Sequence, residues 1–230
     1  MKYRNLEIIG TSHIARQSLE EVEKAITEGR PDIVALELDN RRLHALMSGE
    51  KGKASLKDMG RIGGKGYLFA LFGAWAEKKL GKMVGVAPGS EMKHAAMLAR
   101  NNKIRIALID QDIEITLRRF SKALTWKEKW NFVADIFKAM FSKKGKVEFD
   151  LTKVPEKAVI RKLIGKVKKR YPNIYRVLIE ERNEAMAAKL KRLMSDNEDK
   201  KILAVVGAGH EEEIISILKK PEISYSIKIG

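Results

Sequence analysis

Two histidines in this sequence occupy matching positions, each three residues after a glycine at the end of an apolar run. One segment is Gly10-Thr11-Ser12-His13 and the other is Gly207-Ala208-Gly209-His210. They follow directly on residues 6–9 and 202–206, which are apolar and typical of buried strands. A neutral imidazole can bind a metal ion, or act as a general acid or base near neutral pH. The matching positions predict one site assembled from both ends of the chain.

Glu37 is a third candidate because it directly follows the apolar run Ile33-Val34-Ala35-Leu36. A buried carboxylate without a partner is strongly unfavourable, so Glu37 requires a histidine, an arginine or a metal ion beside it. The alternative is a purely structural ion pair with Arg41 or Arg42, which follow closely in the sequence.

The elements that would position these residues alternate between strands and helices. Residues 3–9 and 33–36 are typical of strands, and Ser18-Leu19-Glu20-Glu21 between them has the spacing of a helix capping box. Strand, helix and strand in succession predict parallel strands. Residues 104–109 and 202–206 are further buried strands. We therefore expect an α/β fold with a mostly parallel central sheet flanked by helices, and a ligand site beyond the carboxyl ends of the strands.

A single domain over residues 1–230 is expected, with helical insertions at about 41–85 and 113–195. The net charge of +16 is concentrated there, with +12 over residues 118–170 and +7 over residues 41–82. This basicity favours an anionic partner such as lipid headgroups, nucleic acid or an acidic protein, and the alternative is a solvated basic face. The chain has no cysteine, so a bound metal would use His, Asp or Glu.

Between residues 113 and 194 the only regular elements predicted are helices, with a loop at 143–150 and a break at Pro172 before a long helix over residues 173–194. Thr125-Trp126-Lys127-Glu128 is a second capping box, and the stripe Trp126, Trp130 and Phe137 that follows is expected in the core rather than in a ligand groove. A final edge strand is expected over residues 224–229. His44 and His94 are expected to be ordinary residues of helix surfaces.

Several further motifs extend from about residue 6 to residue 215 in a fixed order. They are Gly10-Thr11-Ser12-His13, Pro31-Asp32-Ile33-Val34-Ala35-Leu36-Glu37-Leu38-Asp39, Pro88-Gly89-Ser90-Glu91-Met92, Leu108-Ile109-Asp110, Asp112-Ile113, Ile115-Thr116-Leu117, Glu181-Arg182-Asn183 and Gly207-Ala208-Gly209-His210. Together they resemble the TraB/PrgY pheromone-shutdown family. The related GumN and TIKI proteins carry the same paired turns with a Glu and an Arg, and TIKI proteins are described as metal-dependent peptidases.

The resemblance implies an α/β core like that of erythromycin esterase and the haem-binding ChaN proteins. The family's key positions fall on five residues, His13, Glu37, Arg182, Asn183 and His210, with Glu91 and Asp110 as secondary candidates. It further implies a metal-dependent hydrolase acting on peptides. In that mechanism His13, Glu37 and His210 hold a divalent ion, Zn, Mn or Co, that activates water. Arg182 stabilises the oxyanion and Asn183 orients it or the substrate. Gln111 departs from the family pattern, which has a basic residue there.

Two other functions remain open from the residues. One is a protein that binds or sequesters a peptide pheromone without cutting it. The other is a basic membrane-surface or nucleic-acid-binding protein, ranked last because it gives the paired turns no role, with nucleic acid the least expected partner. The sequence does not decide between a monomer and a homo-oligomer. A cytoplasmic location is expected. Many archaeal relatives continue into membrane helices, so membrane association of a full-length protein is the alternative.

Overall fold

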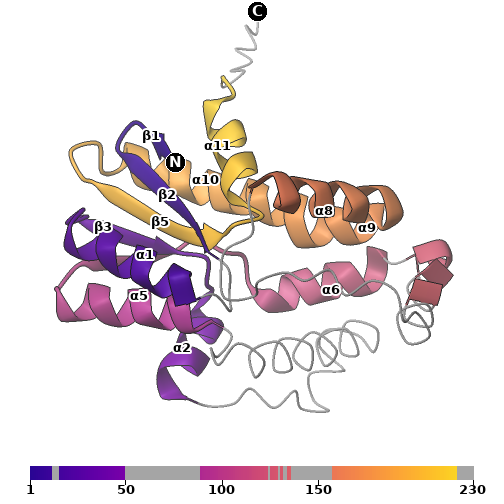
Figure 1. Ribbon diagram of the computed structural model, residues 1–230, viewed down its shortest axis with the longest axis horizontal. Coiled ribbons are helices and arrows are strands. Elements are labelled where there is room, and N and C mark those ends of the chain that lie inside the picture. Colours follow the sequence, from indigo (N-terminus) through magenta and orange to yellow (C-terminus); the bar gives the residue numbers. More distant parts are fainter. Residues whose placement is uncertain are drawn as a thin grey trace, which may run out of the picture.

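The computed structural model describes residues 1–11, 16–49, 89–123, 125–128, 130–131, 134–135 and 157–221. Within these residues one sheet has the strand order β1-β2-β5-β3-β4 (Figure 1). The strands are β1 (Lys2–Tyr3), β2 (Leu6–Thr11), β3 (Ile33–Leu36), β4 (Arg105–Leu108) and β5 (Ile202–Gly207). β1 pairs antiparallel with β2, and all other neighbours pair in parallel. The prediction of a mostly parallel α/β sheet is therefore confirmed.

The described helices are α1 (Arg16–Thr27), α2 (Asn40–Ser48), α5 (Ser90–Asn101), α6 (Ile113–Ala123), α8 (Lys157–Arg170), α9 (Pro172–Tyr175), α10 (Glu181–Ser195) and α11 (Glu211–Lys219). One π-helical turn, η1 (Arg176–Glu180), joins α9 to α10, so the long helix expected after Pro172 is interrupted. None of the helices described is long and apolar enough to cross a membrane. The predicted strand over residues 224–229 lies outside the described residues, as does most of the insertion at 41–85. The division into one domain with two insertions stays a prediction.

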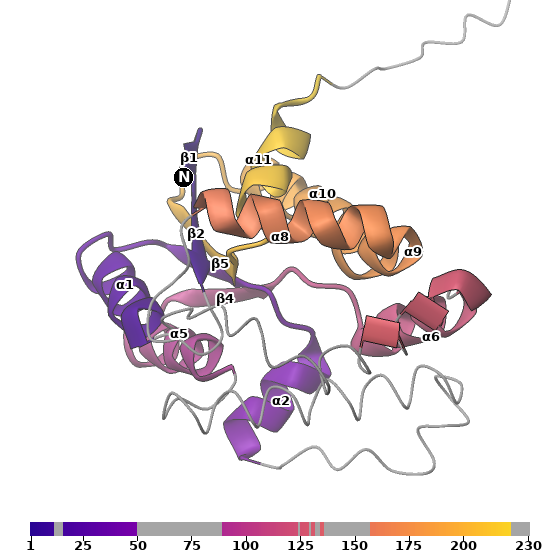
Figure 2. The same cartoon turned by 45° about the vertical axis from the view of Figure 1, so that its right-hand side comes forward.

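Helices cover both faces of the sheet, which gives three layers (Figure 2). Alternate residues of the central strand β5 point to opposite faces. Ala204 and Val206 pack with buried residues of α10 and α11, such as Met186 and Ile214. Leu203 and Val205 belong instead to the core formed with α1 and α5. All six residues of β5 are buried, as expected for a parallel strand covered on both sides.

The carboxyl ends of β2, β5, β3 and β4 meet at one edge of the sheet, because these strands are parallel. Thr11 and Gly207 are partners at the ends of neighbouring strands β2 and β5. The backbone N–H of Ala208 donates to the Thr11 carbonyl at 2.8 Å, and the Thr11 hydroxyl donates to the Val206 carbonyl at 3.2 Å. The two Gly-x-x-His segments therefore begin side by side at the edge of the sheet, and Ser12 and His13 lie outside the described residues.

Gly10 is required at the end of β2 because the second segment passes directly over it. A Cβ on Gly10 would lie 2.9 Å from both the Ala208 Cα and the Glu211 Oε2. We expect Gly10→Ala to lower the free energy of unfolding by about 1–3 kcal/mol, as measured by urea denaturation. Gly165→Ala in α8 is the matched control, since no described atom lies within 4 Å of its new methyl group. The free energy of unfolding of that control should rise by about 0.5–1 kcal/mol, because alanine favours the helix more than glycine does. Equal losses of unfolding free energy in both variants would contradict the prediction.

The second capping box is confirmed, but the core prediction for the tryptophans after it is wrong. The Thr125 N–H donates to Glu128 Oε2 at 3.2 Å, and the Glu128 N–H donates to Thr125 Oγ1 at 3.3 Å. Trp126 and Trp130, however, are 74% and 69% exposed. The reason is that this segment packs against α8 and α9 through polar side chains instead. Phe137, the third member of the predicted stripe, lies outside the described residues.

Candidate functional site

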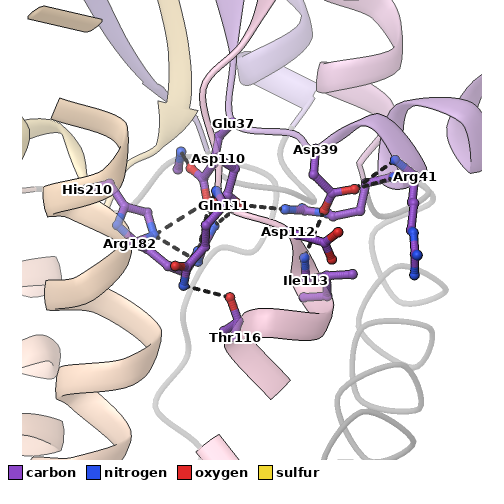
Figure 3. Close-up of polar contacts among 12 residues, drawn as sticks. Glu37, Asp39, Arg41, Asp110, Gln111, Asp112, Ile113, Thr116, Arg182 and His210 are labelled. Atoms are coloured by element: carbon purple, nitrogen blue, oxygen red, sulfur yellow. Dashed lines mark hydrogen bonds and ion pairs between the residues drawn. The ribbon is translucent and has the colours of Figure 1, made fainter. Parts of the chain in front are cut away.

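Glu37 lies directly after β3, buried at the carboxyl edge of the sheet with 2% of its surface exposed. Its Oε2 accepts a 2.6 Å hydrogen bond from the backbone N–H of Gly207. Its Oε1 accepts from Arg182 Nη2 and lies 3.5 Å from His210 Nε2 (Figure 3). The expected partners, an arginine and a histidine, are therefore both present. The nearby Arg42, considered as an alternative, donates to Asp110 at 2.9 Å.

Arg182, the second residue of α10, joins Glu37 to Asp110. Its Nε and Nη2 donate to the two carboxylate oxygens of Asp110 at 3.1 and 2.7 Å. Its Nη1 donates to the carbonyl of Leu178 in η1 at 3.3 Å. Burial alone would lower the pKa of Arg182, but the charges of Glu37 and Asp110 and their hydrogen bonds raise it above its ordinary value. The guanidinium thus remains charged and pairs with two buried carboxylates at once.

Asp110, two residues after β4, is 3% exposed and forms the second half of this cluster. Besides Arg182, its side chain accepts from Arg42 Nη1 and from the backbone N–H of Gln111 at 2.8 Å. The ammonium of Lys189 donates to its backbone carbonyl. Two arginines thus balance the negative charges of Glu37 and Asp110, which burial alone would make strongly unfavourable.

A separate chain of hydrogen bonds holds the imidazole of His210. Glu213 Oε2 accepts from Asn183 Nδ2 at 2.9 Å and from the Tyr175 hydroxyl at 3.1 Å. A carboxylate only accepts, so the amide nitrogen of Asn183 faces Glu213 and its oxygen faces the histidine. Asn183 Oδ1 lies 2.6 Å from His210 Nδ1, which therefore carries the proton.

The opposite ring nitrogen of His210 is directed at the charged cluster. Nε2 lies 3.3 Å from Arg182 Nη1 and 3.5 Å from Glu37 Oε1. In the neutral ring Nε2 accepts from the guanidinium, and in the protonated ring it can donate to Glu37. Burial, followed by the charge of Glu213, raises the pKa of Tyr175, so that hydroxyl keeps its proton and continues to donate.

This chain gives a sharp prediction for Asn183→Asp, which changes one amide to a carboxyl at a fully buried position. The new oxygen would face Oε2 of the partly buried Glu213, and two carboxylates this close together disfavour each other's ionisation. We expect a loss of about 2–3 kcal/mol of unfolding free energy near neutral pH. The shared proton raises the pKa of the pair, so this loss should shrink as the pH falls.

Urea denaturation between pH 5 and pH 8 measures the effect of Asn183→Asp. Asn102→Asp is the control, since Asn102 is exposed at the end of α5 and donates only to a backbone carbonyl. A similar loss in the two variants, or a loss in Asn183→Asp that is independent of pH, would contradict the orientation deduced for the amide.

Two aspartates near the cluster act as helix caps. Asp39 accepts from the backbone N–H groups of Arg41 and Arg42 at 2.8 and 2.9 Å and so begins α2. Asp112 accepts from the N–H of Glu114 at 2.8 Å in the first turn of α6. Of the two acidic residues after β4, Asp112 thus caps the helix and Asp110 joins the charged cluster.

The remaining predicted residues are placed as follows. Glu91 is buried in the first turn of α5, where its charge complements the helix dipole, and its role in the site stays a prediction. Gln111, the departure from the family pattern, donates to the Thr116 hydroxyl at 2.8 Å. His94 lies 3.4 Å from Glu23 on the surface of α5, and His44 is exposed on α2, so both are helix-surface residues as expected.

Sequence reasoning missed three residues that complete the site, Tyr175, Lys189 and Glu213, and it considered Arg42 only as a partner of Glu37. Glu213 belongs to the acidic first turn of α11, where the helix dipole alone favours negative charge. Its position three residues after His210 places both on one side of α11, and this spacing was the available signal.

The described part of the site does not fit a metal ion. Both carboxylate oxygens of Glu37 and both ring nitrogens of His210 already lie within hydrogen-bonding distance of protein groups. The guanidinium of Arg182 lies beside each of these two residues. A divalent ion at these two residues would meet the positive charge of Arg182. No group of three His, Asp or Glu suited to a metal occurs among the residues described. Because His13 is not one of them, the predicted triad of His13, Glu37 and His210 stays a prediction.

Fold and site together define an α/β domain with a buried histidine–carboxylate–arginine cluster at the carboxyl edge of its sheet. The family model of the TraB/PrgY/gumN family matches residues 3–226, and the chain belongs to this family. It is 38% identical over 226 residues to an uncharacterized protein of Methanocaldococcus jannaschii, a match covering 95% of this chain and 54% of the relative.

Animal proteins are more distant relatives. The TraB domain-containing protein of Homo sapiens is 24% identical over 230 residues, covering 88% of this chain and 60% of the relative. The protein of the same name from Bos taurus is also 24% identical and is covered to 59%. The chain thus spans little more than half the length of the curated relatives it matches.

Proposed function

We propose that this TraB-family domain is a hydrolase in which His210 is the general base. The observation that carries the proposal is the 2.6 Å contact between His210 Nδ1 and Asn183 Oδ1, with Asn183 in turn held by Glu213 at 2.9 Å. A histidine with only a structural role needs a single hydrogen-bond partner. The tautomer of His210 is instead fixed by Asn183, whose own orientation is fixed by Glu213. Such orientation of the imidazole is what general-base catalysis requires.

The proposed reaction is the hydrolysis of an amide bond. A water molecule first takes the place of Arg182 Nη1, which lies 3.3 Å from His210 Nε2. Nε2 then removes a proton from this water while the water oxygen attacks the carbonyl carbon. Glu37 Oε1, 3.5 Å from Nε2, stabilises the imidazolium, and Arg182 stabilises the negative charge on the carbonyl oxygen. The carbon–nitrogen bond then breaks, and the proton passes from Nε2 to the leaving amine. The products are a carboxylic acid and an amine.

A peptide is the substrate class we favour, on the resemblance to the TIKI proteins. A divalent metal ion, if His13 completes a site, would supply an activated water. No step proposed here passes through a metal, because Arg182 and Arg42 already balance the charges of Glu37 and Asp110 in the described site.

Binding of a peptide without cleavage is the second candidate function. Burial of the site favours it, since the side chains of Glu37, His210 and Arg182 are only 2%, 8% and 16% exposed. A substrate would have to reach His210 past Arg182, the most exposed of the three. A bound peptide would instead contact the guanidinium of Arg182, with its carbonyl carbon too far from His210 Nε2 for attack by a water molecule held there.

Cleavage of a peptide mixture in ¹⁸O-labelled water, followed by mass spectrometry, tests the proposal. We expect each new carboxyl terminus to carry one ¹⁸O atom, and products to exceed the amount of protein. Prior treatment with a chelator should leave the rate unchanged. Saturable peptide binding with no labelled product would favour the second candidate, and loss of activity after chelation would show that a metal is required.

A further inference from the structure

The helical segment after the Thr125 cap packs on the body of the protein through polar side chains. Glu128 Oε1 accepts from the backbone N–H of Asn173 at 2.8 Å. Asn131 Nδ2 donates to the Arg170 carbonyl at 3.4 Å, and the Arg170 guanidinium donates two 2.5 Å hydrogen bonds to Asp135. Positions 128, 131 and 135 follow helical spacing, so the described contacts of this segment with the body of the protein form one polar stripe.

Trp126 and Trp130 lie on the opposite side of the same segment. Each is two residues from Glu128, and at 3.6 residues per turn that is a rotation of about 200°. Their exposed fractions of 74% and 69% agree with this placement. An amphipathic helix normally buries its large aromatic residues, whereas the two tryptophans described here are exposed. Two adjacent exposed tryptophans are the mark of an interaction surface.

Basic residues lie close to the two tryptophans in the sequence. Arg118 and Lys122 are exposed on the last turns of α6, and Lys127 is exposed between the tryptophans. The sequence from residue 118 to residue 170 carries a net charge of +12. Figures 1 and 2 place the start of the segment directly after α6. We define the tryptophan surface as Trp126 and Trp130 with Arg118, Lys122 and Lys127.

We propose that the tryptophan surface docks on an anionic lipid bilayer. Tryptophan is enriched at membrane–water interfaces, where the ring lies among the headgroups and the indole N–H stays hydrated. Lysine and arginine beside it are attracted to anionic headgroups, by about 1 kcal/mol each near the surface. Combined aromatic and electrostatic binding of this kind holds a protein on a membrane without crossing it. The proposal does not depend on the chemistry at His210.

Two other occupants fit the tryptophan surface less well. A second copy of the chain would bring the same strongly positive region against itself, which is unfavourable. Single-stranded nucleic acid is bound by aromatic rings that lie within a basic groove. Trp126 and Trp130 are instead 74% and 69% exposed, which suits insertion into an interface.

Co-sedimentation of the full chain with lipid vesicles tests the proposal. We expect binding to vesicles of equal parts phosphatidylserine and phosphatidylcholine, little binding to pure phosphatidylcholine, and weaker binding as salt is raised. Trp126→Ala with Trp130→Ala should lower the partition coefficient by at least about tenfold. Met97→Ala is the matched control, since Met97 is an apolar side chain 44% exposed on α5. It should bind as the wild type does.

A second variant separates docking from folding. Lys122→Glu with Lys127→Glu keeps both rings and should lose binding to anionic vesicles selectively. Absence of wild-type binding, or equal binding by the wild type and the tryptophan double variant, would overturn the proposal. So would a dimer in light scattering that the double variant abolishes, or binding of single-stranded RNA without binding of vesicles.

Discussion

Replacement of His210 by alanine should lower the rate of peptide hydrolysis by about 10²- to 10⁴-fold, the range typical for loss of a general base. The imidazole is the only group in the described site with a nitrogen both oriented by a hydrogen-bond chain and directed at Glu37 and Arg182. A neutral Nε2 must accept the proton from water, so the wild-type rate should also fall toward acidic pH. Initial rates with a peptide identified by mass spectrometry measure both effects.

His94→Gln is the control for His210→Ala. His94 is a partly exposed histidine on α5 and lies 3.4 Å from Glu23, away from the cluster. Its replacement should leave the rate within about twofold of wild type. If His210→Ala retains the wild-type rate while the protein stays folded, cleavage does not proceed through this imidazole.

Arg182→Met should reduce the free energy of unfolding by about 3–5 kcal/mol, because removal of one partner leaves charges buried without compensation. Two carboxylates are affected at once, Glu37 and Asp110, which are 2% and 3% exposed. Methionine keeps most of the apolar length of the side chain, so the loss reports mainly on charge. Urea denaturation at neutral pH measures it.

Arg192→Met is the control on the same helix. Arg192 is 86% exposed and lies 3.6 Å from Asp196, and such surface pairs contribute less than about 1 kcal/mol. Adding Glu37→Gln and Asp110→Asn to the Arg182→Met variant should restore part of the lost stability, since neutral amides need no counter-charge. Equal losses for Arg182→Met and Arg192→Met would show that the buried carboxylates have other compensation.

The sequence predicted the strands and their shared edge because parallel buried strands have a simple signature. Residues 33–36 and 202–206 are continuous apolar runs that start at the first residues of β3 and β5. The expected burial of Glu37 was enough to predict that its carboxylate has a partner, and in the structure the partners are Arg182 and His210. That Arg182 belongs to the site came only from the resemblance, since an arginine in a long amphipathic helix carries no local signal.

What the sequence did not predict depends on contacts between distant elements. Tyr175 and Glu213 are 38 residues apart and meet only after α9 and α11 have packed. The tryptophan segment was misjudged because periodicity identifies an apolar side but not which side faces the protein. Here buried hydrogen bonds at Glu128 and ion pairing at Asp135 determined the orientation.

The strand order has a consequence for biosynthesis. β5 is the last described strand to leave the ribosome, yet it lies between β2 and β3 and pairs with both. Until it is made, these two strands present unsatisfied edges to solvent, and such nascent chains are prone to aggregation. Insertion of β5 brings together residues far apart in the sequence, and this high contact order should make refolding slow. We expect Glu37 to accept the hydrogen bond of the Gly207 amide only in the final stage of folding, when β5 is in place.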